Sequence, residues 1–83
     1  MAMKLKSGFE VVRYSDLDYE QMTVELQYQG EQVAQINMDK GIENLEVELF
    51  TEFLDPSFKP VFKLTDLLEA IGEARKCLEG YQI

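Results

Sequence analysis

The groups in this chain best suited to chemistry are its carboxylates. Glu46 and Glu48 are two positions apart in a segment that alternates apolar and acidic residues. On a strand, that spacing places both side chains on one face, about 7 Å apart. Paired carboxylates can act as general acid and base, and with Glu25 alongside they also suggest a weak divalent-cation site. Because exposed carboxylates alone make a poor cation cage, we favour a solvated strand face over either kind of site.

Few other reactive groups are present. The chain has no histidine and a single cysteine, Cys77. The commonest general base is therefore missing, as is every Ser-His or Cys-His arrangement, and one cysteine cannot supply a structural zinc site. We expect no enzyme, no catalytic residue, no cofactor and no metal, and we expect Cys77 to be a small, partly buried hydrophobic residue.

Negative charge is concentrated in the middle of the chain. The 83 residues carry a formal net charge of -8. Between Tyr14 and Phe58, eleven acidic residues stand against one base, Lys40, which gives that stretch a net charge of -10. Such a field attracts a basic partner, whereas nucleic acid and anionic membranes need Lys and Arg on the protein. The charge predicts a basic protein partner, no nucleic acid and no membrane.

Size and composition indicate one domain over residues 1–83, with residues 1–7 as a loose lead-in. A lone cysteine forms no internal disulfide, which fits the cytoplasm. The N-terminus does not read as a secretory signal, and no apolar stretch approaches the roughly 20 residues of a membrane helix. A domain this small is marginally stable unless it dimerises or binds something, so a homodimer remains open.

Alternation of apolar and polar residues predicts most of the secondary structure. Gln29-Gly30 and Asp39-Lys40-Gly41 are expected turns between strands. A helix is expected after Leu64, with Thr65 as its N-cap and Gly80 at its end. Leu68 and Ile71 are expected in the core, on an apolar stripe along that helix. The expected strands are Phe9–Tyr14, Met22–Tyr28, Gln32–Met38 and Leu45–Phe50.

One apolar sheet face and one apolar helix stripe must cover each other. The chain is therefore predicted to be an α+β fold, a four-stranded antiparallel β-meander with one C-terminal α-helix packed on one face. The opposite face would be open, polar and acidic. It carries no lysine, although exposed sheets usually mix both signs of charge. We interpret it as the partner-binding face, made up of Glu25, Glu46, Glu48, Gln27, Gln35, Asn37 and Thr23.

A hydrophobic loop from Phe53 to Phe62 precedes the helix. It is expected to pack on an edge of the core. The three phenylalanines of this loop, together with one just before it, could instead line an aromatic ligand pocket, although in a small domain such residues usually belong to the core and its rim. The four are Phe50, Phe53, Phe58 and Phe62.

Three segments together resemble small acidic bacterial immunity proteins of polymorphic-toxin systems. They are residues 19–25, residues 41–50 and residues 64–75. Those proteins are short and cytoplasmic, and each binds and neutralises a toxin encoded beside it. The resemblance covers most of residues 8–79 in the order of elements, and it implies inhibition by occlusion of a toxic enzyme. It carries over no site residue.

Two functions follow as hypotheses. In the first, the chain is a protein-binding inhibitor whose acidic sheet face covers the basic surface of a toxin, for example a nuclease. In the second, it is a small structural or regulatory subunit that assembles through the hydrophobic loop or a strand edge.

Overall fold

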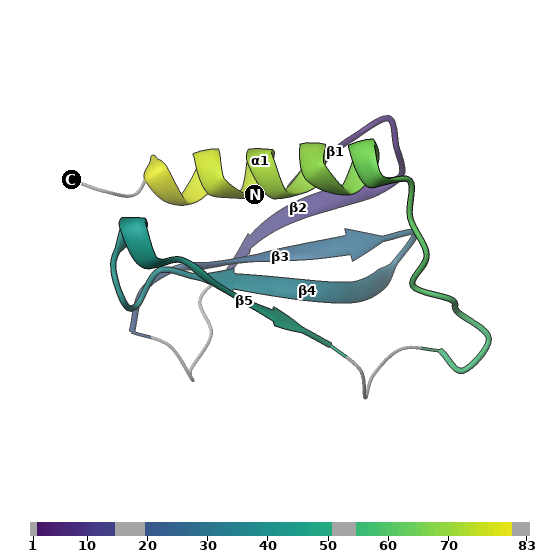
Figure 1. The fold of residues 1–83 in the computed structure, drawn as a ribbon, viewed down its shortest axis with the longest axis horizontal. Helices are drawn as coiled ribbons and strands as arrows, with labels where there is room; N and C mark the ends of the chain where they lie inside the picture. The colour runs from purple at the N-terminus through teal and green to yellow at the C-terminus, as the bar shows by residue number, and fades with distance from the viewer. Residues whose placement is uncertain (1, 15–19, 51–54, 81–83) are drawn as a thin grey trace.

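A computed structural model describes residues 2–14, 20–50 and 55–80. The expected α+β fold is confirmed. An antiparallel meander with the strand order β1-β2-β3-β4-β5 is followed by one helix, α1, which lies along one face of the sheet (Figure 1). The elements are β1 (Ala2–Lys4), β2 (Phe9–Tyr14), β3 (Thr23–Tyr28), β4 (Glu31–Asn37), the 3₁₀ turn η1 (Ile42–Asn44), β5 (Glu46–Leu49) and α1 (Leu64–Glu79).

The sheet has five strands rather than the expected four, because part of the supposed lead-in is strand β1. It pairs antiparallel with β2, with Met3 opposite Val11. The turn between the two strands depends on Gly8, whose φ of 105° favours glycine. The Gly8 amide donates to the Leu5 carbonyl at 3.1 Å. Three residues are too few for alternation to reveal a strand, but the glycine is a turn signal that marks the hairpin.

The expected turns are confirmed. Gln29 and Gly30 both have positive φ, 50° and 88°, as a two-residue hairpin turn matched to strand twist requires. At the next turn, the Gly41 amide donates to the Met38 carbonyl at 3.0 Å. The 3₁₀ turn η1 follows directly, so β5 begins one residue later than expected.

The core lies between α1 and the sheet. Helix α1 packs mainly against β2 and β3, which leaves the β4–β5 side of the sheet less covered (Figure 1). The helix approaches closely because it presents alanines: Ala70 and Ala74 are fully buried, as is Leu78. The sheet contributes Phe9, Val11, Val24, Leu26, Ala34, Ile36 and Met38, and Val33 of β4 is buried as well.

The expectation that Leu68 and Ile71 belong to the core is wrong. Leu68 is 56% exposed and Ile71 is 38% exposed. The helix carries two neighbouring apolar stripes, and the one with the alanines faces the sheet because small side chains allow close approach. The N-cap also lies two residues earlier than expected, at Lys63 rather than Thr65, and it has no side-chain cap.

The hydrophobic loop packs on the core, as expected, where the structure describes it. The Phe62 ring lies 5.0 Å from the Phe9 ring and 5.0 Å from the Tyr28 ring, measured between centroids. Phe58 lies 6.4 Å from Tyr28 in the same way. These rings extend the core rather than line an open ligand pocket. Phe53 falls outside the described residues.

Candidate functional site

Strand β4 lies between two strands that carry the same tripeptide. Val-Glu-Leu occurs at 24–26 in β3 and at 47–49 in β5. Both copies run antiparallel to β4, and their pairing produces three cross-strand rows. Neighbouring rows project to opposite faces of the sheet. The rows are Val24–Ile36–Val47, Glu25–Gln35–Glu48 and Leu26–Ala34–Leu49.

The glutamate row belongs to the polar face that the sequence predicts. Asn37 pairs with Glu46 one step further along, and Thr23 and Gln27 flank Glu25 at the two-residue spacing of one strand face. All seven residues expected to bind a partner therefore lie on the sheet face opposite α1.

The expectation that this face is open is wrong at its centre. Thr23, Glu25, Gln35 and Asn37 are each at most 5% exposed, and Gln27 is half-buried. Glu46 and Glu48, both on β5, are exposed. Alternation assigns a residue to a face, but it does not reveal whether that face meets solvent.

Hydrogen bonds satisfy the buried part of the face. The Gln35 amide nitrogen Nε2 donates to Oγ1 of Thr23 at 3.2 Å. The Gln27 Nε2 donates to Oε1 of Glu25 at 2.7 Å. No buried side-chain nitrogen or oxygen in the described parts of the chain lacks a partner. Since burying a carboxylate is costly unless it is hydrogen-bonded, the donation from Gln27 helps Glu25 to lie in the sheet.

The lysine that the polar face was expected to lack is supplied by the turn before β5. Lys40 Nζ lies 2.8 Å from Oε2 of Glu46. The hydrogen bond to Glu46 and its negative charge raise the pKa of Lys40 above its ordinary value. Both side chains are well exposed, so the pair contributes little to stability. The positive charge of Lys40 does make this end of the face less negative.

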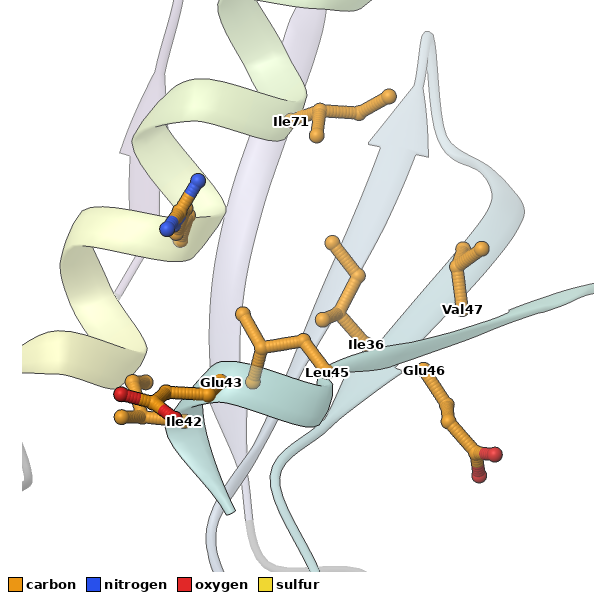
Figure 2. Close-up of a pocket in the computed structure, with 8 residues that line it drawn as sticks. Ile36, Ile42, Glu43, Leu45, Glu46, Val47 and Ile71 are labelled. Atoms are coloured by element: carbon orange, nitrogen blue, oxygen red, sulfur yellow. The ribbon is translucent and has the colours of Figure 1, made fainter. Parts of the chain in front are cut away.

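The other side of β5 is apolar and also exposed. A pocket of about 330 Å³ opens between α1 and strands β4 and β5. In Figure 2, Ile71 of α1, Ile36 of β4 and Leu45 lie around it, whereas the Glu46 side chain points away. Val47 is 57% exposed and Leu49 is 69% exposed on this side of the sheet. The full lining is Ile36, Ile42, Glu43, Leu45, Glu46, Val47, Ile71 and Arg75.

Strand β5 is therefore the centre of the candidate site. All four of its residues are exposed, with acids on one side and apolar residues on the other. We define the β5 surface as strand β5 together with Leu64, Leu68 and Ile71, the exposed stripe of α1 on its pocket side. The apolar part was missed from the sequence, because Val47 and Leu49 alternate as core residues do.

One signal in the sequence could have revealed the uncovered strand. A helix is about 10 Å wide and strands are spaced about 4.8 Å apart. One helix therefore covers about two strands, and a sheet of four or five must leave others bare on that face.

Other residues with chemical potential have structural roles. Cys77 is partly buried against the core, as expected. Ser57 donates to Asp55 from its hydroxyl at 2.6 Å and from its amide at 2.8 Å, which lowers the pKa of that carboxyl and fixes a local turn. Over residues 2–14, 20–50 and 55–80, no three His, Cys, Asp or Glu side chains are grouped to hold a metal ion.

No helix in the described part of the chain has the length and hydropathy to span a membrane.

Comparison of the chain with protein-family models, curated proteins and solved structures gives no match. The function must therefore be argued from the β5 surface itself.

Proposed function

We propose that this protein is a protein-binding inhibitor of the immunity-protein kind, which occludes a basic toxin domain, for example a nuclease. The observation that carries the proposal is the exposure of β5. It presents Glu46 and Glu48 beside exposed Val47 and Leu49. Interfaces commonly combine apolar contacts with charges that select and orient the partner.

Charge supports the direction of the proposal. Residues 14–58 carry a net charge of -10, and such a field accelerates encounter with a basic partner. A nuclease binds its anionic substrate through a basic surface, so an acidic protein docked there excludes that substrate. Inhibition by occlusion needs no catalytic group on this chain. We therefore propose that the protein is not an enzyme. We also propose that it acts in the cytoplasm.

The proposed contact set is narrower than the polar face expected from the sequence. Glu46 and Glu48 are placed to touch a partner. The buried residues of the face, Glu25 and Gln35 among them, instead support β4, against which β5 is paired.

The test uses the protein encoded in the neighbouring reading frame, which we expect to be the toxin. We expect it to co-purify with this chain and to lose its enzymatic activity on addition of one equivalent. Raising the salt should slow association, because screening weakens steering between opposite charges. No binding at low salt, or binding without inhibition, would contradict the proposal.

A matched pair of variants locates the surface. Glu46→Lys/Glu48→Lys and Glu69→Lys/Glu73→Lys change the net charge equally. Glu69 and Glu73 lie on the flank of α1 away from Ile71, by helical spacing. We expect the β5 variant to associate with the toxin at least about tenfold more slowly than the α1 variant at low salt. Equal rates would mean that net charge, rather than the β5 surface, governs binding.

The exposed apolar residues of the β5 surface also favour a second candidate, a subunit that assembles through its strand edge. The hydrophobic loop is weaker support, because Phe58 and Phe62 pack on the core and Val61 is the large apolar side chain that stays exposed over residues 55–63. Sedimentation of the purified chain separates the candidates, since self-assembly at micromolar concentration favours the second.

A further inference from the structure

The backbone of β5 has hydrogen-bonding groups directed out of the sheet. The Phe50 amide donates to the Val33 carbonyl of β4 at 3.0 Å. In an antiparallel ladder, alternate residues bond to the same neighbour. Glu48 and Glu46 therefore face β4 as Phe50 does, and the N–H and C=O groups of Val47 and Leu49 point away from it. In the part of the chain that the structure describes, β5 is the last strand on this side of the sheet.

The side chains at this edge are also placed to receive a strand. An added strand would lie about 4.8 Å from β5, and its side chains on the α1 side would adjoin Val47 and Leu49. Those two residues are more than half exposed. The pocket beside them, between α1 and β4–β5, gives apolar side chains of the added strand a place to pack.

Strand β4 shows, within this molecule, what complements a Val-Glu-Leu strand. Opposite Val24 and Leu26 it places Ile36 and Ala34, and opposite Glu25 it places the hydrogen-bonding residue Gln35. The outer side of β5 offers the same three residue types in the same order. Its complement is thus an apolar residue, a polar residue and an apolar residue.

A second copy of this chain fits that requirement poorly. Antiparallel pairing of two β5 strands would set Glu46 and Glu48 against the same acids of the other copy, and like charges on neighbouring strands are destabilising. Acids on an edge strand are a common protection against self-pairing. A partner strand with a cationic residue at the polar position, opposite the acids of β5, fits better, given the acidity of the chain.

We propose that β5 binds an extended segment of a partner protein by strand addition, and that this segment alternates apolar with basic residues. Its apolar side chains lie on Val47 and Leu49 beside α1, and its basic side chains lie on the Glu46–Glu48 side. This inference rests on the proposed function in that the chain is taken to bind a basic protein, and it specifies how.

The probe is a capped hexapeptide, Val-Lys repeated three times, titrated into the isotopically labelled protein. We expect amide NMR shifts centred on Val47 and Leu49, with hydrogen exchange slowed at both amides as they become bonded. A Val-Glu hexapeptide of the same length, and a peptide with three valines followed by three lysines, should bind much more weakly. Shifts centred on β2 or β3, or equal binding of the three peptides, would overturn the proposal.

A pair of variants isolates the backbone contribution. Val47→Pro removes an N–H that points away from β4, and proline is tolerated at such edge positions. Val47→Ala removes the side chain but keeps the N–H. We expect the proline variant to bind the Val-Lys peptide at least about tenfold more weakly than the alanine variant. Equal affinities would contradict strand addition. If Val47→Pro fails to fold, hydrogen exchange at the Val47 and Leu49 amides of the wild-type protein tests the proposal instead.

These results are separable from the test of the proposed function. If Val47→Pro and Val47→Ala inhibit the toxin equally, the strand-addition proposal is wrong, whereas the proposed inhibitor function still stands. If the peptide binds at β5 but the toxin is not inhibited, the proposed inhibitor function is wrong, whereas the proposal that β5 binds an added strand still stands. A stable dimer of the free protein with protected Val47 and Leu49 amides would show that a second copy occupies the edge, and would overturn the proposal.

Discussion

Strands β3 and β5 carry the same Val-Glu-Leu sequence in opposite surroundings. In β3 all three residues are buried, and in β5 all three are exposed. Both segments pair with the same residues of β4, Ala34 to Ile36. The difference therefore does not arise from the residues or from their direct neighbour in the sheet.

Position in the sheet explains the contrast. Strand β3 is central, with β2 and β4 on its two sides and α1 across one face, whereas β5 lies at an edge away from the main contacts of α1. The same residues thus stabilise the fold in one place and form a surface in the other. We propose that β3 serves folding and that β5 serves binding, and identical substitutions in the two strands test that division.

The largest contrast is expected for the glutamates. Glu25→Lys places an ammonium group where a buried carboxylate accepts a hydrogen bond from Gln27, and we expect a loss of about 3–5 kcal/mol in the free energy of unfolding. Glu48→Lys, on an exposed position, should change it by no more than about 0.5 kcal/mol. Urea denaturation measures both. Similar losses for the two variants would show that β5 is as enclosed as β3.

The leucines provide the next contrast. Leu26 is 1% exposed, and Leu26→Ala should cost about 2–5 kcal/mol because it leaves a cavity in the core. Leu49→Ala should cost no more than about 0.5 kcal/mol, yet it should weaken binding of the proposed partner. Denaturation and binding measured on the same two proteins check both statements. A Leu49→Ala protein that is both destabilised and fully competent to bind would reverse our assignment.

The smallest effect belongs to a turn outside both strands. Because hydrogen bonds from Ser57 lower the pKa of Asp55, this carboxylate contributes stability above its ordinary pKa and loses it as the pH falls through the lowered value. Asp55→Ala should slightly lower the thermal midpoint at pH 7, and the difference from wild type should vanish in acid. A difference that persists at low pH would mean that charge is not its cause.

The sequence predicts much of the fold because local patterns determine it. Alternation at residues 22–28, 32–38 and 45–50 locates three strands to within one residue at each end. Turn residues such as Gly30 locate the connections, and helical spacing locates α1. Strand β1 escapes detection because three residues are too short for a periodic pattern.

The candidate site was predicted less well, because exposure depends on distant parts of the chain. Alternation correctly groups Glu25, Gln35 and Glu48 on one face, but burial of the first two follows from their central place in the sheet. In the same way, helical spacing does not decide whether Ala70 or Ile71 faces the sheet. Because the helix lies close to the strands, the small side chain of Ala70 faces the sheet and Ile71 does not.

The most direct test of the division between β3 and β5 is hydrogen exchange, measured by mass spectrometry, on the protein alone and in complex with the proposed toxin partner. We expect the complex to slow exchange further in peptides that cover residues 45–50 and residues 64–72. Peptides that cover residues 23–28 should be unchanged, because β3 is already enclosed. Protection that appears over β1 and β2, with none over β5, would contradict the assignment of binding to the β5 surface.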